Sequence, residues 1–406
     1  MSRIVLGVSG GIAAYKACEI VRRLRDAGHE VTVVPTANAL KFVGETTFAA
    51  LSGRPVASDV FTAAENIPHV RLGREADLVV VAPATADLVA RQAAGRADDL
   101  LTNVLLTATC PVLVCPAMHT EMWQNPATVH NVALLRSRGI VVLDPAEGRL
   151  AGPDSGVGRL PEPAEIVEVA QSLLDDQVAA GARHRDLAGV RVVVSAGGTH
   201  EAIDPVRFIG NASSGLMGVA LARAAALRGA QVTLVAANLS VPAPSSVALR
   251  TAVTTGDLAT AMTEAAADAD VVVMAAAPAD FTPVDPSATK LKKSGDAGLV
   301  LELTQTTDIL AALGRSRRPG QTVVGFAAET VSDPAALVEA GRAKLGRKGA
   351  DLLVVNDVSG NKVFGLSETT VMIVDAAGVR ASATGSKTVV AHRILDAVVQ
   401  YRAASM

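Results

Sequence analysis

The sequence predicts an α/β protein built from two doubly wound, Rossmann-like domains. Three observations predict it: a length of 406 residues, short apolar runs that alternate with helix-length stretches, and a restart of that alternation near residue 190. A single hydrophobic core stops growing near roughly 250 to 300 residues, so a chain of this length is expected to divide. Short apolar runs between helices are typical of a parallel sheet covered on both faces. We therefore expect one such sheet in each half of the chain.

The first domain, expected over residues 1–175, opens with a strand, a helix and a second strand. Arg3 to Val8 is an apolar run short enough for a buried strand, Gly28 ends the helix, and residues 30–34 give the second strand. Apolar residues at helical spacing define the helix: Ile12, Tyr15, Ile20, Val21 and Leu24. The pattern continues with strands at 78–81, 112–115 and 140–143 and a closing helix at 162–174.

A linker is expected at 176–188, where Asp, Gly, Ala, His and Arg mix without an apolar period. The second domain, residues 189–406, then repeats the alternation of strands and helices. Its expected strands lie at 190–195, 231–235, 271–274, 323–326 and 352–355, with a helix at 216–227. A hairpin follows, whose turn at 375–378 joins strands at 371–374 and 379–382, and a helix at 387–401 closes the domain.

Composition and charge exclude several classes of function. The net charge is −3 and only 19% of residues are charged, so no global field attracts nucleic acid. Aromatic residues make up 2%, too few for bases to stack on. No apolar run approaches the roughly 18 residues that a membrane helix needs, and no signal peptide follows Met1. We expect a cytoplasmic protein that binds neither nucleic acid nor membrane.

The cysteines and histidines show no metal pattern. Cys18, Cys110 and Cys115 are odd in number and lack a C-x-x-C spacing, which fits a reducing compartment. The histidines form no H-E-x-x-H or other zinc pattern. Cys18 falls in the first helix and Cys115 at a buried strand end, so structural roles are expected for both.

The first glycine-rich loop is a candidate phosphate site. Ser9-Gly10-Gly11 follows a strand and precedes a helix, where N–H groups and the helix dipole favour an anion. A tight turn in any doubly wound protein would explain the same glycines. The loop is not G-x-G-x-x-G, and the second strand ends at Pro35-Thr36 rather than at an acid that holds a ribose. Flavin mononucleotide (FMN) therefore fits this loop better than a dinucleotide.

One motif occurs in both halves. DLVVVAPATAD at 77–87 and DVVVMAAAPAD at 270–280 each place a Pro-Ala loop after a buried strand. In open parallel sheets ligands bind at the carboxyl ends of the strands, so both loops are candidate sites. The alternative is that Ala and Pro merely turn the chain.

Small polar residues and lysines in the second half suggest a phosphate site. Gly197-Gly198-Thr199 and the segment 211–215 surround a helix start with hydrogen-bonding residues. The cluster at 290–293, KLKK, follows Asp280, a candidate magnesium ligand, and could neutralise a triphosphate. Lys344 and Lys348 lie one helical turn apart and could add to the same field. A solvated basic loop and an exposed helix face are the alternatives.

These motifs together resemble two enzyme families. SGGIAAYK at 9–16, His69 in IPHVRL, APATAD at 82–87 and PAMHTEMW at 116–123 resemble the flavin-dependent cysteine decarboxylases. SAGGTHEAIDPVRFIGNASSGLMG at 195–218, AAPAD at 276–280, KLKK at 290–293 and GFAAET at 325–330 resemble phosphopantothenate-cysteine ligase. In this order within one chain, they are similar to the bifunctional family of coenzyme A biosynthesis. The resemblance implies a flavodoxin-like flavoprotein domain followed by a ligase domain.

For the ligase domain, the resemblance implies 4'-phosphopantothenate, L-cysteine and CTP as substrates, with magnesium. The carboxylate of phosphopantothenate attacks the α-phosphate of CTP, and the amine of cysteine then displaces CMP from the acyl-cytidylate. Lys290 matches the family's catalytic lysine, and Asn211 matches the asparagine that handles the acyl-cytidylate. The residues implied to hold CTP are Ala276, Asp280, Lys290, Thr307, Asp308, Ile309, Leu310, Phe326, Lys344 and Lys348.

For the decarboxylase domain, the resemblance implies FMN as the cofactor, because the carbanion left by carbon dioxide needs an electron sink. His69 matches the family's active-site base, whereas a lone histidine in a loop is more often structural. The residues expected to hold FMN are Ser9, Gly10, Gly11, Thr36, Pro83 and Thr85, and those expected to contact the substrate are His119 and Met122.

The sequence departs from the decarboxylase pattern at two positions. The family's P-A-M-N motif has an asparagine where this chain has His119, a side chain of different reach and variable charge. The family's mobile flap carries a cysteine in an A-C-G motif that donates a proton, whereas residues 149–154 here read RLAGPD. Asp154, Ser155 or water could replace that donor.

Two alternative functions follow from the same residues. The first half could be a non-catalytic flavin-binding regulatory module, with only ligase activity left, which the missing flap cysteine favours. Fold analogy alone suggests a nicotinamide oxidoreductase, against which the glycine loop and the missing acid argue. The family also implies a homo-oligomer, a dodecamer in which decarboxylase domains form trimers and ligase domains form dimers.

Overall fold

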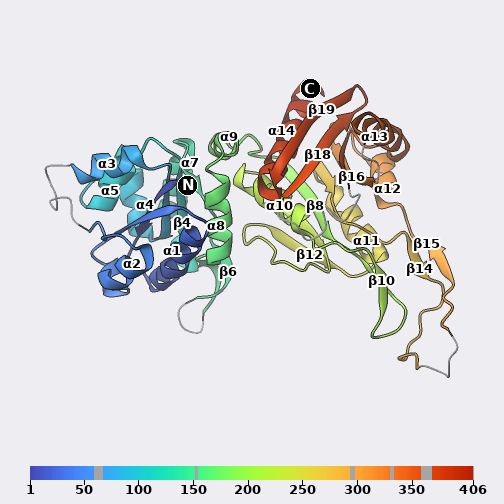
Figure 1. Cartoon of the computed structure of the whole chain (residues 1–406), viewed down its shortest axis with the longest axis horizontal. Coiled ribbons are helices and arrows are strands. Elements are labelled where there is room, and N and C mark those ends of the chain that lie inside the picture. Colours follow the sequence, from blue (N-terminus) through green and yellow to red (C-terminus); the bar gives the residue numbers. More distant parts are fainter. Residues whose placement is uncertain (59–66, 151–153, 293–297, 330–332, 358–367, 406) are drawn as a thin grey trace. The chain divides into compact units, whose positions relative to one another are not determined.

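The chain folds into two compact units, Met1–His184 and Arg185–Met406, in a computed structural model (Figure 1). The structure describes residues 1–58, 67–150, 154–292, 298–329, 333–357 and 368–405. Each unit contains one large sheet, as the sequence predicts. Within the described residues, no helix combines the length and the apolar character needed to cross a bilayer.

The first unit is a five-stranded parallel sheet in the order β2-β1-β3-β4-β5. This is the flavodoxin-like strand order, in which ligands bind at the point where the strand order reverses, between β1 and β3. The strands are β1 (Arg3–Val8), β2 (Glu30–Pro35), β3 (Leu78–Ala84), β4 (Val112–Pro116) and β5 (Val141–Val142), with a hairpin of β6 (Ala146–Arg149) and β7 (Ser155–Arg159). The helices are α1 (Lys16–Asp26), α2 (Glu45–Ser52), α3 (Pro68–Glu75), α4 (Ala86–Ala93), α5 (Leu100–Thr107), α6 (Thr120–Trp123), α7 (Pro126–Ser137), α8 (Pro163–Ser172) and α9 (Asp176–His184).

The first unit differs from the sequence-based prediction in two places. Ile12 and Tyr15 do not continue the buried face of α1, because they lie in a separate 3-10 turn, Ile12–Tyr15, and are 65% and 61% exposed. The predicted linker contains α9, which buries Val178, Ala179 and Ala182. The chain divides after His184, inside the range 176–188. Burial of these three apolar side chains stabilises α9, although most of its other residues are polar.

The second unit is an eight-stranded sheet in the order β12-β11-β8-β13-β16-β17-β18-β19. Its first six strands are parallel and the last two are antiparallel, which is the Rossmann order with a hairpin added. The strands are β8 (Arg191–Gly197), β11 (Gln231–Ala237), β12 (Ala248–Ala252), β13 (Val271–Met274), β16 (Thr322–Glu329), β17 (Leu352–Asp357), β18 (Glu368–Asp375) and β19 (Gly378–Ser386). The helices are α10 (Leu216–Leu227), α11 (Thr255–Ala266), α12 (Ile309–Ser316), α13 (Pro334–Lys348) and α14 (Lys387–Ser405).

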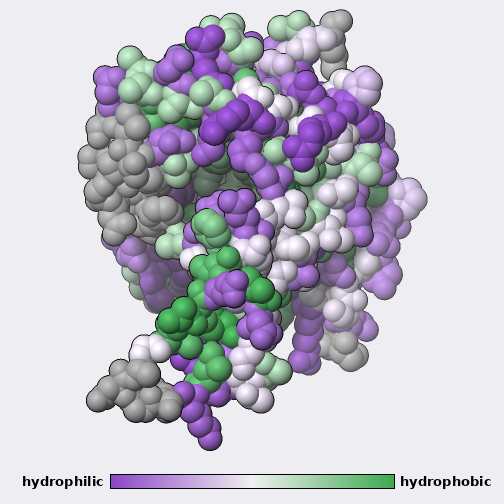
Figure 2. Space-filling model, turned by 90° about the vertical axis from the view of Figure 1, so that its right-hand side faces the viewer, coloured by the Kyte–Doolittle hydropathy of each residue, from purple (hydrophilic) through white to green (hydrophobic). Residues whose placement is uncertain are grey.

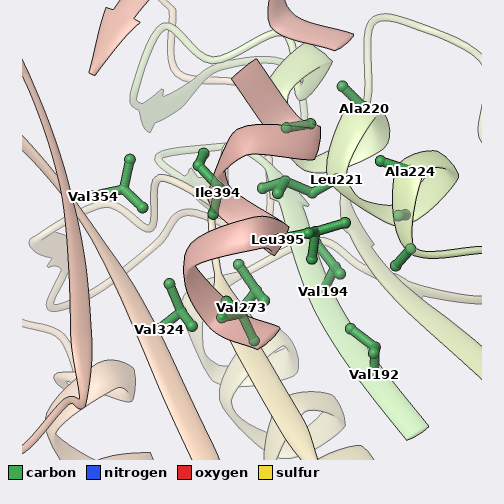
Figure 3. Packing of buried hydrophobic residues seen from close by; sticks show 14 of the residues in the cluster. Val192, Val194, Ala220, Leu221, Ala224, Val273, Val324, Val354, Ile394 and Leu395 are labelled. Atoms are coloured by element: carbon green, nitrogen blue, oxygen red, sulfur yellow. The ribbon is translucent and has the colours of Figure 1, made fainter. Parts of the chain in front are cut away.

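Helices cover both faces of this sheet. On one face α10 and α14 pack on the strands, and Figure 3 shows Leu221, Ile394 and Leu395 directed at strand valines. Those valines are Val194, Val273, Val324 and Val354. On the other face Leu258 of α11 and Leu313 of α12 belong to a second buried cluster. The unit is therefore doubly wound. Two short hairpins, β9 (His200–Ala202) with β10 (Phe208–Gly210) and β14 (Phe281–Pro283) with β15 (Leu303–Gln305), stand outside the sheet.

The motif repeated in the sequence occupies the same place in both units. The backbone N–H of Arg3 donates to the Asp77 carboxylate at 2.7 Å, and that of Arg191 donates to Asp270 at 2.8 Å. In each unit the strand that follows this aspartate, β3 or β13, lies beside the first strand, β1 or β8. The two Pro-Ala loops therefore both lie at the carboxyl ends of strands, as the sequence predicts, and the structure adds that these strands lie where the strand order reverses.

Candidate functional sites

In the first unit, Ser9 joins the glycine loop to the Pro-Ala loop. Its hydroxyl donates to the carbonyl oxygen of Pro83 at 2.8 Å and accepts from the backbone N–H of Thr85 at 2.9 Å. Thr85 caps α4 by accepting from Leu88 N–H. Because Ser9 is 1% exposed and its hydroxyl is already bonded, it fixes the loops rather than offering a donor to a ligand.

The glycine loop can accept an anion. Within the described residues, no hydrogen bond uses the N–H groups of Gly10 and Gly11, which precede the 3-10 turn and α1. A Cβ on Gly10 would clash with Asn38, because the loop after β2 approaches closely. Thr36 begins that loop, where its hydroxyl accepts from Ala39 N–H. The six residues predicted to hold FMN thus lie at the carboxyl ends of β1, β2 and β3.

His69 lies on α3, which packs against α5. Its carbonyl oxygen accepts from the Thr107 hydroxyl at 2.9 Å, which fixes the backbone there. The ring atom Nδ1 is buried and has no hydrogen-bond partner within the described part of the chain. A buried nitrogen without a partner is uncommon in folded proteins. Among the described residues, no hydrogen bond joins His69 to the glycine loop.

The segment after β4 carries His119 and Met122 and supports the β6–β7 hairpin. Ala117 N–H donates to Ala84, which holds this segment beside the Pro-Ala loop, and Met118 N–H donates to the carbonyl oxygen of Gly158 in β7. His119 precedes the short helix α6, and Met122 is 47% exposed. The predicted flap lies at the tip of this hairpin, and its residues 151–153 fall outside the described residues.

In the second unit, a pocket of about 610 Å³ opens at the carboxyl ends of the parallel strands. The predicted residues that line it are Asn211, Ala276, Asp280, Asp308, Leu310, Phe326, Lys344 and Lys348. Three predicted residues do not line it. Thr307 and Lys290 are exposed to solvent, and Ile309 is buried in the core.

The first turn of α10 forms one wall of this pocket. Leu216, Met217 and Gly218 line it, and no side chain caps the helix at Gly215. The N–H of Leu216 donates to the Ser214 hydroxyl at 3.5 Å, and the other N–H groups at the helix start favour negative charge, as does the helix dipole. Ser213 and Ser214 add hydroxyl groups to the same wall. This wall therefore suits a phosphate.

The lysines of the pocket differ in their pairing. Lys344 forms an ion pair with Glu329 at 3.3 Å, and Lys348 is paired with Asp308. Burial alone would raise the pKa of Asp308, but hydrogen bonds from Lys348 and from Ala311 N–H outweigh it and lower that pKa. Both lysines thus have a carboxylate partner before any ligand binds.

Hydrogen bonds to the backbone of the next residue fix the position of Lys290. The next residue, Leu291, donates its N–H to Asp204 and accepts from Arg207 at its carbonyl oxygen, at 3.1 and 2.6 Å. Asp204 lies in the turn of the β9–β10 hairpin and also accepts from Val206 and Arg207. Burial would raise its pKa, but these donors lower it to about 2. Lys293 falls outside the described residues.

Sequence reasoning missed the far wall of the pocket, formed by Lys387, Asn356 and Thr369. Lys387 is the first residue of α14, and burial lowers its pKa. Among the described residues it makes no ion pair. The hairpin at 371–382 and the helix after it were predicted, but the sequence does not show that the start of this helix meets the pocket at the carboxyl ends of the parallel strands.

The fold and these sites define a two-domain α/β protein in which a candidate anion site lies at a sheet edge in each half. Comparison with known proteins agrees and is more specific. Residues 1–175 match the family Flavoprotein, and residues 187–401 match the DNA/pantothenate metabolism flavoprotein C-terminal domain.

Full-length relatives carry both domains in the same order. The chain is 53% identical to the coenzyme A biosynthesis bifunctional protein CoaBC of Mycobacterium tuberculosis (strain ATCC 25618 / H37Rv), over 99% of this chain and 97% of that protein. It is 41% identical to CoaBC of Escherichia coli (strain K12), over 88% of this chain and 86% of that protein. A crystal structure of the C-terminal domain of a CoaBC protein is 32% identical, covering 53% of this chain and 97% of that one, with a TM-score of 0.44.

The chain belongs to the family of bifunctional coenzyme A biosynthesis proteins CoaBC. It is a bifunctional enzyme with a flavoprotein decarboxylase domain and a ligase domain. The family therefore gives the chain a decarboxylase and a ligase domain in place of the nicotinamide oxidoreductase suggested by fold analogy.

Proposed function

We propose that the second unit joins L-cysteine to 4'-phosphopantothenate with CTP, and that the first unit decarboxylates the product to 4'-phosphopantetheine with FMN. The pocket of about 610 Å³ is the observation that carries the proposal. It combines an uncapped helix start, a carboxylate and three lysines at one sheet edge: Lys344, Lys348 and Lys387. That combination suits a nucleoside triphosphate and a second phosphorylated substrate.

In the ligase reaction, the carboxylate of phosphopantothenate attacks the α-phosphate of CTP and pyrophosphate leaves. Cysteine's amine then attacks the acyl carbon, and CMP leaves. The first turn of α10 and the lysines stabilise the charge that gathers on the phosphates. Asp280 lines the pocket and would hold magnesium, which needs only one or two protein carboxylates besides phosphate oxygens. Lys290 reaches the α-phosphate from its anchored loop.

In the decarboxylase reaction, the residues around the glycine loop fit FMN. The unbonded N–H groups of Gly10 and Gly11 suit its phosphate. The bound flavin supplies the electron sink that lets carbon dioxide leave. His69 takes a proton at the ring nitrogen that has no partner within the described residues, and His119 orients the substrate carboxylate.

We also propose that the protein assembles into the dodecamer predicted from the family, with ligase units paired. Large apolar side chains are exposed on the two short hairpins and the segments beside them, and Figure 2 shows hydrophobic surface gathered over β14 and β15. Those residues are Val206, Phe208, Phe281, Val284, Leu299, Val300 and Leu303. A second copy of the same surface would cover them. The free thiols of Cys18, Cys110 and Cys115 support a cytoplasmic location.

Mass-resolved product analysis tests both activities. The purified chain is given phosphopantothenate, cysteine, CTP and magnesium, and we expect phosphopantetheine, CMP and pyrophosphate. His69→Asn should stop at phosphopantothenoylcysteine, whereas His130→Asn, at an exposed histidine of α7, should behave as wild type. If wild type itself stops at phosphopantothenoylcysteine, the first unit is the non-catalytic flavin module instead.

A further inference from the structure

A buried chain of hydrogen bonds ends on the loop that carries Asp280. The backbone N–H of Ala279 donates to the Thr199 hydroxyl at 2.8 Å, and the hydroxyls of Thr199 and Thr255 lie 3.0 Å apart. The Thr255 hydroxyl donates to the Glu201 carboxylate at 2.9 Å. These three side chains are 0%, 2% and 5% exposed, and none of them lines the pocket.

The number of available hydrogens fixes which group donates in each of these hydrogen bonds. An N–H group only donates, so Thr199 accepts from Ala279. A carboxylate only accepts, so the Thr255 hydroxyl directs its single hydrogen to Glu201 at 2.9 Å, a shorter bond than the 3.4 Å to the carbonyl oxygen of Ala279. Thr199 must then donate to Thr255. Each hydroxyl thus donates one bond and accepts another along the chain, and such chains strengthen one another inside a protein.

The charged end of the chain is itself anchored. The same oxygen of Glu201 accepts the backbone N–H of Thr255 at 2.8 Å, at the first position of α11. A carboxylate at a helix start is stabilised by the helix dipole and by a donor that otherwise has no partner. Glu201 therefore holds a fixed position from which the chain extends to Ala279.

The other end of the chain joins two parts of the nucleotide site. The carbonyl oxygen of Ala279 accepts from the Thr306 hydroxyl at 2.6 Å, and Thr306 N–H donates to the carbonyl oxygen of Asp280 at 3.0 Å. Thr306 directly precedes the segment 307–310. Fixing Ala279 therefore fixes both the backbone of Asp280 and the start of that segment.

We propose that Glu201, Thr255 and Thr199 are positioning residues that hold the Asp280 carboxylate where it binds the magnesium of CTP. This inference rests on the proposed function of the second unit. It gives a buried role to Thr199 and Glu201 of the sequence motif THEAID, together with Thr255 at the start of α11.

The test uses Thr199→Val, which keeps the shape of the side chain and leaves the Ala279 N–H without a partner. Calorimetry with CTP and magnesium should show binding weakened about tenfold, and half-maximal ligase activity should need several-fold more magnesium. The KM for cysteine should stay within about twofold, because the amine reacts after CTP has been consumed. Thr199→Ser restores the hydroxyl and should recover wild-type values.

A double-mutant cycle separates positioning from general structural damage. If Thr199 acts through Asp280, Thr199→Val should weaken CTP binding no further in an Asp280→Asn background. Additive losses would overturn the inference. The decarboxylase turnover and the unfolding temperature of the same chain report on folding. Thr255→Val breaks the chain one bond further away, and is expected to shift the magnesium requirement in the same direction if Thr199→Val fails to fold.

Other outcomes are also decisive. Wild-type protein that binds no CTP would refute the proposed function and leave the buried chain without a nucleotide to position. Wild-type protein that binds CTP, together with Thr199→Val and Thr255→Val proteins of unchanged affinity and magnesium requirement, would refute this inference alone.

Discussion

Asn211 donates its side-chain amide to the carbonyl oxygen of Pro278 at 2.8 Å, and so ties the segment before α10 to the repeated Pro-Ala loop. The amide nitrogen carries two hydrogens, so one remains for a ligand in the pocket that Asn211 lines. A single side chain can therefore fix the loop and also contact the acyl-cytidylate.

Replacing Asn211 by Asp should separate the two half-reactions. The carboxylate removes both donors and places an oxygen against the Pro278 carbonyl. We expect pyrophosphate release in a single turnover to stay within about threefold of wild type, and CMP release to slow about a hundredfold, the cost of losing one donor to a reacting oxyanion. Rapid-quench measurement of both products tests this. Equal slowing of both steps would assign Asn211 to loop support alone.

Lys387 is expected to bind a substrate phosphate. Lys387→Met should weaken binding of CTP or of phosphopantothenate about tenfold in calorimetry, because a charge-assisted hydrogen bond to phosphate is lost. Lys387→Arg keeps the charge and should recover most of the affinity. Lys41→Met, at an exposed lysine of the first unit, is the matched control. Unchanged affinity for both substrates would remove Lys387 from the site.

The same lysine predicts a pH dependence. Burial lowers the pKa of Lys387 in the folded chain, whereas a bound phosphate favours its charged form. Substrate affinity should therefore fall as the pH rises through the lowered pKa, before an ordinary lysine loses its charge. The unfolded chain binds more protons at this residue in that window, so its cost to stability disappears as the pH rises. Lys387→Arg should shift the fall in affinity to higher pH.

Asp204 supports the Lys290 loop, and its replacement by Asn should impair the reaction more than nucleotide binding. The amide accepts fewer of the hydrogen bonds made by Val206, Arg207 and Leu291, so Lys290 loses its fixed position. We expect kcat of the ligase to fall about tenfold with the CTP dissociation constant within about twofold. A rise in that dissociation constant without a fall in kcat would contradict this role.

The lowered pKa of Asp204 adds a stability prediction. Because its folded pKa, about 2, lies below the ordinary value, its contribution is complete above that ordinary value and is lost as the pH falls toward 2. Urea unfolding of wild type and Asp204→Asn should therefore converge as the solution is acidified through that window. A constant difference across it would show that the charge of Asp204 contributes nothing.

Much of the fold could be predicted because buried strands and glycine stops leave direct marks in the sequence. β1, β13 and α10 begin and end at the predicted residues. The short hairpins β9–β10 and β14–β15 were missed, because each strand is only three residues long and has no apolar alternation to reveal it.

The positions of candidate residues could be predicted where a loop directly follows a buried strand, and much less so elsewhere. Loops at the ends of adjacent parallel strands could be grouped from the strand pattern alone, as with Ser9 and Pro83. Lys387 and the chain from Glu201 to Ala279 could not, because they depend on which distant segments meet. Ile12 and Tyr15 were wrongly assigned to the buried face of α1. Their helical spacing does not reveal that they lie in a separate, exposed turn.

Gly10 is expected to be essential for flavin binding and irrelevant to the ligase. A Cβ there would clash with Asn38 and push the glycine loop away from the end of β2. Gly10→Ala protein should purify without the visible absorbance of bound FMN and should keep wild-type ligase rates. Gly44→Ala is the control, because a Cβ at Gly44 meets no atom within 4 Å and the residue has an ordinary extended backbone. A Gly10→Ala protein that keeps the yellow colour of bound FMN would show that this loop does not bind the phosphate of the flavin.

The β6–β7 hairpin should be needed for decarboxylation through its contact with the His119 segment. Gly158 has φ of +154°, and a Cβ there would clash with the carbonyl oxygen of Met118, whose N–H donates to Gly158. Gly158→Ala should therefore lift the hairpin and reduce decarboxylase turnover at least about tenfold, with FMN content and ligase rate unchanged.

Gly148 provides the matched control for that variant. It lies in the same hairpin with φ of +152°, but a Cβ there would meet only the Arg159 side chain at 3.4 Å. Gly148→Ala thus carries similar backbone strain without the clash against Met118, and should keep most of the turnover. If both variants lose turnover equally, backbone strain within the hairpin explains the loss. The contact between Gly158 and Met118 then has no separate role in the reaction.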